Sequence, residues 1–273
     1  MKTYRLYSAI LMMALCFNFV SCGDDDDNNI IDPENVTKRL VRVVDTDDGE
    51  VFYALNFDYD SKGRVVSVSE DKNNCCNISY SGNKATANFH YYDNNADEYV
   101  DYNKYWTLDD QNNILSEDYG DENSGEVTKF TYTNGYCTKE VGGSELTYSE
   151  TNYNYKDGLL INTDNNDYVD GVLINNYNNY NITYTDIPNK GNILVHRYIY
   201  EDFEVYSWAG LLGNSPRLLP EKFTWRDSGY DVTATFKYDL DKDGYVKRVT
   251  ISEVSSNGDR ATETLDFVYE DIK

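Results

Sequence analysis

The chain has 273 residues, of which 48 are Asp or Glu and 24 are Lys or Arg, and its formal net charge is −24. A negative field of this size repels nucleic acid and anionic membrane surfaces, and no basic patch offsets it, so nucleic-acid binding is excluded. With 27 Tyr and 4 Pro, the composition favours strands over disorder. The length is enough for one large β domain or two small ones.

The first 21 residues have the layout of a secretory signal. Lys2 and Arg5 precede a mostly apolar run over residues 10–20, which is too short to span a bilayer as a mature helix. Residues 19–23 (FVSCG) resemble a bacterial lipobox, in which the cysteine is acylated and becomes the mature N-terminus. We therefore predict a lipoprotein signal peptide over residues 1–21 and a membrane-lipid anchor on Cys22. The alternative is an ordinary cleaved signal followed by an incidental cysteine.

An acidic segment follows the lipobox. Residues 22–35 contain four consecutive aspartates and one proline, and because like charges repel and extend a chain, they predict a solvated tether. The aspartate run also resembles the surface-export signal of Bacteroidetes lipoproteins. The expected location is therefore the outer membrane, lipid-anchored and facing the cell surface. The alternative is a linker without an export role.

Residues 36–273 are predicted to be a single β domain built from a repeated hairpin. Each repeat has an alternating aromatic strand, a turn rich in Asp, Asn or Gly, and an aliphatic strand; residues 57–66 and 236–246 are the most complete copies. In residues 51–59 apolar and polar side chains alternate, which is typical of an antiparallel meander with one dry face. A sheet of so many hairpins is too wide to stay flat, so we expect a large half-barrel or barrel.

One segment interrupts this pattern. In residues 202–213 (DFEVYSWAGLLG), Phe203, Tyr206 and Ala209 recur at roughly helical spacing, and Gly213 is a stop signal. The pattern predicts one short helix near residues 203–212, followed by a loop over residues 214–220 that caps one end of the sheet.

The C-terminal third carries a resemblance to a known family. Residues 208–225 (WAGLLGNSPRLLPEKFTW), followed by residues 236–252 (FKYDLDKDGYVKRVTIS), resemble a Bacteroidetes lipoprotein family with a domain of unknown function described as having a porin-like fold. The likeness covers most of residues 36–273. It implies a porin-like fold of serial aromatic hairpins, but it supplies no activity and no functional residue. It does not imply a pore, because these strands are too polar for a lipid-facing band.

A possible calcium loop lies near the C-terminus. Asp239, Asp241 and Asp243, followed by a glycine, match the start of an EF-hand loop, in which alternating oxygens converge on Ca²⁺. The twelfth position is Thr250 instead of a bidentate glutamate, and the flanks are typical of strands. We expect a plain turn here, with weak Ca²⁺ binding as the alternative, and no other cofactor.

Catalytic motifs are missing from the sequence. His90 and His196 stand in no known catalytic motif, so we expect no enzyme activity. Cys75, Cys76 and Cys137 lack the spacing of metal ligands and indicate non-catalytic thiols, although one of the first two could pair with Cys137. With so many carboxylates, an acid/base pair for glycoside cleavage stays open as an alternative.

The many aromatic side chains suggest a binding role. Trp208, Tyr177 and Tyr180 are the leading candidates for stacking on a ligand, and further rings could contribute from Trp106, Trp225, Tyr91 and Tyr92. The alternative is that these rings build the dry face of the sheet.

We expect an outer-membrane, surface-exposed lipoprotein that acts as a non-catalytic ligand-binding or scaffold module for glycans or a partner membrane protein. The alternatives are a carboxylate-dependent hydrolase acting on a polysaccharide and a purely structural surface protein.

Overall fold

The described part of the chain consists of antiparallel strands without a helix. The computed structural model describes residues 37–47, 49–70, 73–93, 97–120, 126–178, 181–193, 210–227 and 229–272. The strands are β1 (Lys38–Asp47), β2 (Glu50–Tyr59), β3 (Val65–Ser69), β4 (Cys75–Ser81), β5 (Lys84–Asp93), β6 (Glu98–Leu108), β7 (Ile114–Asp118), β8 (Val127–Thr133), β9 (Tyr136–Gly143), β10 (Thr147–Lys156), β11 (Leu159–Val169), β12 (Val172–Asn178), β13 (Asn181–Pro188), β14 (Leu218–Asp227), β15 (Tyr230–Leu240), β16 (Val246–Ser255) and β17 (Arg260–Asp271).

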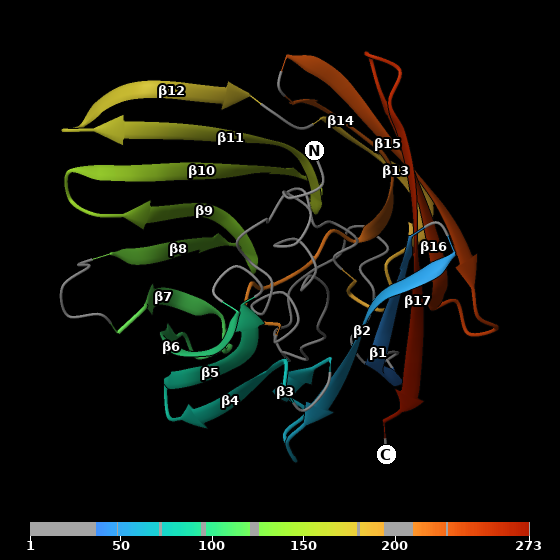
Figure 1. Cartoon of the computed structure of the whole chain (residues 1–273), viewed down its shortest axis with the longest axis horizontal. Helices are drawn as coiled ribbons and strands as arrows, with labels where there is room; N and C mark the ends of the chain where they lie inside the picture. Colours follow the sequence, from blue (N-terminus) through green and yellow to red (C-terminus); the bar gives the residue numbers. More distant parts are fainter. Residues whose placement is uncertain are drawn as a thin grey trace, which may run out of the picture.

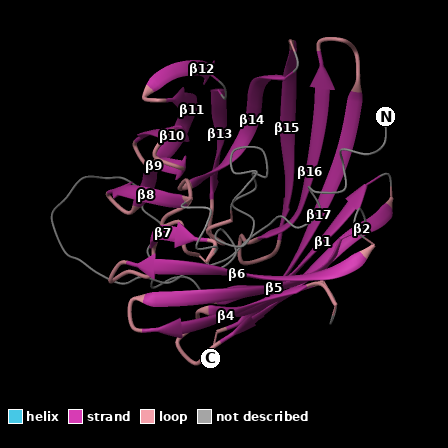
Figure 2. Cartoon of the chain, turned by 60° about the vertical axis from the view of Figure 1, so that its left-hand side comes forward, coloured by secondary structure: helices cyan, strands magenta, loops and turns pink. Residues whose placement is uncertain are grey.

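All 17 strands belong to one sheet that curls into a ring (Figure 1). Strands β2 to β12 pair in sequence order, as do β13 to β17, and β1 pairs with both β2 and β17. In Figure 2, β14 to β17 run steeply while β4 to β6 lie across the view, so the sheet twists as it curls. The predicted all-β antiparallel meander is confirmed.

The ring is not closed by hydrogen-bonded strands. Within the described ranges, β12 forms a hydrogen-bonded ladder with β11 and β13 forms one with β14, but no such ladder joins β12 to β13. Strand β13 nevertheless contacts β11 through side chains. The Tyr184 hydroxyl of β13 donates a hydrogen bond to the Leu160 carbonyl oxygen of β11 at 2.8 Å. We call this junction the seam.

The repeated hairpin explains which end of the ring is closed. In five of the repeats, a tyrosine that stands two residues after an apolar residue (the Φ-x-Tyr phrase, where Φ is Phe or Ile) donates a hydrogen bond from its hydroxyl group to a carbonyl oxygen of the preceding neighbouring strand. The pairs are Tyr59 to Leu40, Tyr80 to Val65, Tyr132 to Ile114, Tyr184 to Leu160 and Tyr238 to Pro220. A buried phenol needs such a partner, and the carbonyl groups lie next to the turns. These contacts line one end of the ring, here called the closed end.

A segment of the chain crosses the closed end. Residues 210–217, the crossing segment, bond to successive loops of the sheet: the Leu211 carbonyl accepts from the Ile114 amide at 2.8 Å, and the Asn214 amide donates to the Gly135 carbonyl at 2.8 Å. The Arg217 amide then donates to the Gly158 carbonyl at 3.2 Å.

The predicted helix is therefore wrong where it is described. Residues 210–212 form a turn, because their peptide groups and side chains contact the sheet rather than the next helical turn. Residues 203–209 lie outside the described ranges. The expectation that the following loop caps one end of the sheet agrees with the position of residues 214–217, whereas Leu218 already begins β14.

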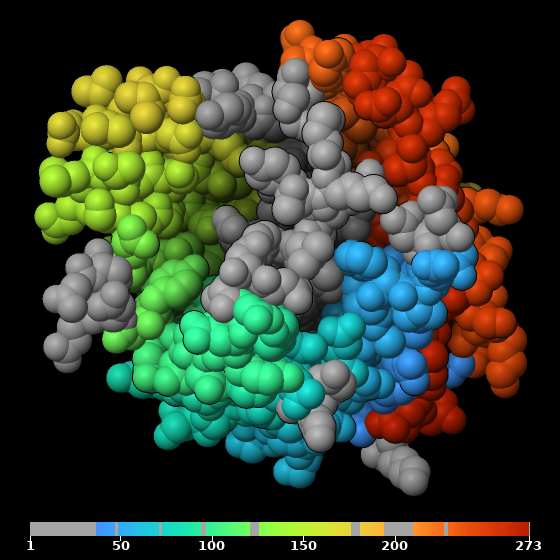
Figure 3. All heavy atoms as spheres, in the orientation of Figure 1, coloured from blue at the N-terminus to red at the C-terminus, as the bar shows by residue number. Residues whose placement is uncertain are grey.

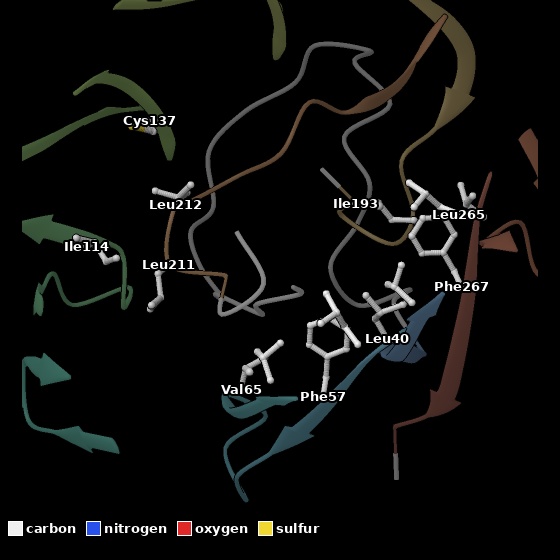
Figure 4. Packing of buried hydrophobic residues seen from close by; sticks show 14 of the residues in the cluster. Leu40, Phe57, Val65, Ile114, Cys137, Ile193, Leu211, Leu212, Leu265 and Phe267 are labelled. Carbon is white, nitrogen blue, oxygen red and sulfur yellow. The ribbon is translucent and has the colours of Figure 1, made fainter. Parts of the chain in front are cut away.

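The apolar core fills the inner face near the closed end. Figure 4 shows Leu211, Leu212 and Ile193 inside the ring, among core residues of several strands, such as Phe57 and Phe267. All of these side chains are buried. The crossing segment thus supplies apolar side chains where the curled sheet surrounds more space than its own residues fill.

The three described cysteines are free. Cys76 and Cys137 are buried in the core, and burial raises the pKa of both thiols far above the ordinary value. A bridge between Cys137 and one of the other two is therefore not formed.

The predicted signal peptide over residues 1–21, the tether over residues 22–35 and the lipidation site Cys22 lie outside the described ranges and stay predictions. The described ranges contain no helix that is long and apolar enough to cross a membrane.

The crossing segment generates a test of the closed end. Gly213 has φ +78°, and a Cβ atom at this position would overlap the carbonyl oxygen of Gly135. Gly63 has the same φ but no atom within 4 Å of an added Cβ. We expect Gly63→Ala to lower the free energy of unfolding by about 1–2 kcal/mol through backbone strain, and Gly213→Ala to lower it by about 1–3 kcal/mol more through the clash. Urea unfolding of both variants measures the difference, and equal losses would contradict the role given to the crossing segment.

Candidate functional site

The β5–β6 hairpin carries aromatic rings on both of its faces. On the inner face, which continues into the core, Phe89 stacks on Tyr102 with ring centroids 4.5 Å apart and an interplanar angle of 6°. Tyr91 meets the edge of Tyr102 at 5.8 Å and 87°. All three rings are only partly buried. Successive side chains of a strand point to opposite faces, so the alternation of residues 89–92 places the remaining rings outside.

The outer face repeats this arrangement. His90 stacks on Tyr99 with centroids 5.1 Å apart and an angle of 4°, and Tyr92 meets Tyr99 at 5.0 Å. The His90 Nδ1 atom lies 2.7 Å from the Asp101 carboxylate, and the Tyr92 hydroxyl donates to Asp97, which raises the pKa of Tyr92. We call these six rings the aromatic hairpin: Phe89, His90, Tyr91, Tyr92, Tyr99 and Tyr102.

A buried ion pair supports the base of the aromatic hairpin. The Trp106 indole N–H donates to Glu117 Oε2 at 2.8 Å, and Lys104 Nζ lies 3.5 Å from Glu117 Oε1. The Lys104 ammonium also lies 3.3 Å from the Tyr119 hydroxyl, and 5.8 Å from the centre of the Phe89 ring. These contacts fix β6 against β7 directly below the exposed rings.

The surroundings of this pair shift both pKa values upward. Burial raises the pKa of Glu117, which is 2% exposed, and the nearby Lys104 ammonium and Trp106 N–H only partly offset this effect. For Lys104, burial acts to lower the pKa, but the charge of Glu117 and the hydroxyl groups of Tyr119 and Tyr102 outweigh it, so the pKa is raised.

The calcium candidate forms a turn that holds an ammonium group. Asp241 Oδ1 accepts from the amides of Asp243 and Tyr245 at 2.8 and 3.0 Å. Asp241 Oδ2 and Asp243 Oδ2 lie 2.6 and 2.5 Å from Lys38 Nζ. Asp239 is not part of this cluster, because it lies in β15 opposite Arg248.

The charges in this turn stabilise one another. Hydrogen bonds with Asp241 and Asp243 raise the pKa of Lys38, despite the opposing effect of partial burial. Burial acts to raise the pKa of Asp241, but hydrogen bonds from Lys38 and two backbone amides lower it overall. In the described ranges, no three His, Cys, Asp or Glu side chains form a group that could hold a metal ion.

The same turn recurs elsewhere at the closed end. Asp60 Oδ1 accepts from the amides of Lys62 and Arg64, both at 2.9 Å, and Asp109 Oδ1 accepts from the amides of Gln111 and Asn113, both at 2.8 Å. The Asp241 turn is therefore one member of a repeated loop type in which an aspartate caps the backbone.

The other candidates from the sequence are scattered. Tyr177 lies in β12 opposite Asn165, but its side chain is outside the described part, as are Tyr180 and Trp208. Trp106 is buried, and Trp225 packs against the core.

Sequence reasoning identified Tyr91 and Tyr92 but missed several members of the site and its base: Phe89, Tyr99, Tyr102, Lys104, Glu117 and Tyr119. The dense rings of residues 89–92 and 99–106 are a signal that could have marked the hairpin.

Comparison with solved structures identifies similar folds. A porin-like protein from Bacteroides uniformis ATCC 8492 has a TM-score of 0.63 and 15% sequence identity, covering 86% of this chain and 98% of that chain. A porin-like protein from Bacteroides vulgatus ATCC 8482 has a TM-score of 0.56 and 14% identity, covering 85% and 98%. No protein-family model and no curated protein matches the chain. At these identities the likeness shows a porin-like fold alone, and the expected lipoprotein family stays a prediction.

The ion pair generates a double-mutant cycle. We expect Lys104→Met and Glu117→Gln each to lower the free energy of unfolding by about 2–3 kcal/mol, because each leaves one charge without its partner in a largely buried place. The double variant removes both charges and keeps an acceptor for the Trp106 N–H, so it should cost clearly less than the sum. Urea unfolding gives the coupling energy.

The exposed pair Arg248–Asp266, whose atoms lie 2.6 Å apart, is the control. Its cycle should give a coupling below about 1 kcal/mol. Additive losses at Lys104 and Glu117 would show that the two side chains are not coupled.

Calcium binding can be tested against Lys38. We expect no heat when millimolar Ca²⁺ is titrated into the wild-type protein, because the Lys38 ammonium lies between the Asp241 and Asp243 carboxylates. Lys38→Gln frees these oxygens and should give weak binding that Asp241→Asn abolishes in the same background. Calcium binding of equal strength with and without Lys38 would contradict this interpretation.

Proposed function

We propose that the protein is an outer-membrane lipoprotein, anchored through Cys22 and facing the cell surface, whose β domain is a non-catalytic module that binds glycans on the aromatic hairpin. The observation that carries the proposal is the set of six partly exposed rings on the two faces of one hairpin. Rings that serve only to fill a core are expected to be covered, because leaving apolar surface in water costs about 25 cal/mol per Å².

The chemistry of the hairpin suits a sugar. Flat rings such as Tyr91 and Tyr99 offer faces for the C–H groups of a pyranose, and rigid aromatic side chains lose little entropy on binding. The carboxylates of Asp97 and Asp101, which contact the Tyr92 hydroxyl and the His90 Nδ1 atom, lie beside the outer rings and can accept hydrogen bonds from sugar hydroxyls.

The position of the hairpin fits an anchored protein. The Thr37 amide donates to the Tyr245 hydroxyl at 2.9 Å, and the Ile272 amide donates to the Thr37 carbonyl at 2.8 Å, so the described chain starts at the closed end. The β5–β6 turn is at the opposite end of the ring, since β4 and β5 are joined by a turn at the closed end, next to the contact of Tyr80 with Val65. A tether over residues 22–35 that joins the domain near Thr37 would thus direct the aromatic hairpin away from the membrane. The signal-like leader, the acidic segment and the porin-like fold support this location.

A hydrolase acting on a polysaccharide is the second candidate. Glu117 has the raised pKa that a general acid needs. Its side chain is nearly fully buried, however, and its oxygens contact the Trp106 N–H and the Lys104 ammonium. A carboxyl group held in this way stabilises the base of the hairpin and is poorly placed to meet a substrate.

Binding is tested with a glycan array followed by titration calorimetry on the best glycan. We expect Tyr99→Ala to weaken binding about tenfold, the loss of about 1.4 kcal/mol, and Tyr91→Ala to act in the same direction. Tyr230→Ala is the matched control, because Tyr230 is 47% exposed on the β14–β15 hairpin and Tyr99 is 50% exposed. The control should bind like the wild type.

Two results would overturn the proposal. The first is a failure of the binding test, seen either as no binding of the wild-type protein to any glycan or as equal effects of Tyr99→Ala and Tyr230→Ala. The other is release of reducing ends from a polysaccharide panel that Glu117→Gln abolishes, which would establish the hydrolase.

A further inference from the structure

Strand β12 is an edge of the described sheet. It pairs with β11 on one side, from Val172 opposite Val169 to Asn178 opposite Asp164, and no other described strand pairs with its second side. Figure 3 shows β12, in yellow, at the rim of the molecule. Proteins usually protect such an edge with Lys or Pro, and β12 (VLINNYN) contains neither. It has a bulge at Ile174, but residues 175–178 pair regularly with β11.

Exposed aliphatic side chains gather where β12 begins. Val172, Leu173 and Ile174 are 64%, 49% and 54% exposed. The Asp170 amide donates to the Leu146 carbonyl at 2.7 Å, which brings the neighbouring β9–β10 turn against this corner. We call the exposed cluster the tip patch: Leu146, Val169, Val172, Leu173 and Ile174. Apolar residues gathered on adjacent turns are typical of an interaction surface.

The charge around the tip patch is of one sign. Residues 144–149 and 164–178 contain Glu145, Asp164, Asp167 and Asp170, and no Lys or Arg. These carboxylates repel anionic lipid headgroups and disfavour a second copy of the same edge, which would bring the same acidic groups opposite one another. They attract basic side chains.

We propose that the β12 edge and the tip patch dock an extended segment of a partner protein, with alternating apolar side chains and basic flanks, which adds to the sheet as a further strand. The backbone groups of residues 175–178 supply hydrogen bonds to the incoming strand. The tip patch covers its apolar side chains, and the four carboxylates pair with its basic ends. This surface is separate from the aromatic hairpin.

The proposal is tested on the full chain with a synthetic peptide in which alternating valine and threonine residues stand between two pairs of lysines. Two comparison peptides replace the lysines with glutamates, or methylate alternate backbone nitrogens so that they cannot donate hydrogen bonds. Fluorescence anisotropy measures binding, and amide hydrogen exchange locates it. We expect binding of the lysine peptide alone, weakened by salt, with new protection over residues 172–178.

Substitutions in the protein distinguish binding at the β12 edge from non-specific binding. Ile174→Lys should weaken peptide binding at least about tenfold. Ile161→Lys is the matched control, because Ile161 is a 40% exposed aliphatic residue on β11, away from this edge, and it should leave binding unchanged.

Each other outcome overturns the proposal. Absence of binding, equal binding of the three peptides, or equal effects of the two substitutions would show that the edge does not recognise a basic strand. Self-association or vesicle binding that Ile174→Lys abolishes would assign the patch to a second copy or to lipid. The β12 amides that face β11 are protected in any case; protection of the outward-facing amides before peptide is added would show that the chain covers its own edge.

Discussion

A sheet of this width surrounds more space than its own side chains can fill, and the structure depends on how one end of that space is occupied. Barrels of about eight strands are filled by their inward side chains, whereas rings of 16–18 strands leave a channel. Here the crossing segment places Leu211 and Leu212 inside the ring, and its peptide groups form hydrogen bonds with three successive turns of the sheet. The core is therefore an end plug rather than a layer along the whole inner face. The aromatic hairpin lies away from that plug, which is why its inner rings keep contact with solvent.

Two small structural units, repeated, build the closed end. In the Φ-x-Tyr phrase, a tyrosine hydroxyl donates to a carbonyl oxygen of the neighbouring strand. In the aspartate turn, a carboxylate accepts hydrogen bonds from backbone amides of the residues that follow it. The seam uses the same tyrosine contact, at Tyr184, where the hydrogen-bond ladder is missing. A side chain thus maintains the ring where the backbone does not.

The alternation in residues 51–59 and the aspartate turns were predicted well from the sequence, because both act over a few residues. The tyrosine contacts between neighbouring strands were not predicted. The sequence-based prediction failed at residues 210–212, where helical spacing of apolar side chains arises from contact with the sheet. The Lys38–Asp241 and Lys104–Glu117 pairs were also out of reach. The first joins residues 203 positions apart, and the second depends on the register that places Trp106 opposite Glu117. Tyr91 and Tyr92 were recognised as rings, but their grouping on one hairpin requires the pairing of β5 with β6.

The position of β1 between β2 and β17 has a consequence for how the protein acquires its structure. Lys38 pairs with Asp271, so the first strand of the domain reaches its second neighbour only when the last strand is present. Pairing over such a separation is slow, since loop closure precedes the gain from contacts. The edge of β1 that faces β17 stays unpaired until the C-terminal strand has been synthesised. The ring is thus completed late in folding, and loss of the final strand by truncation would leave β1 and β16 both with a free edge.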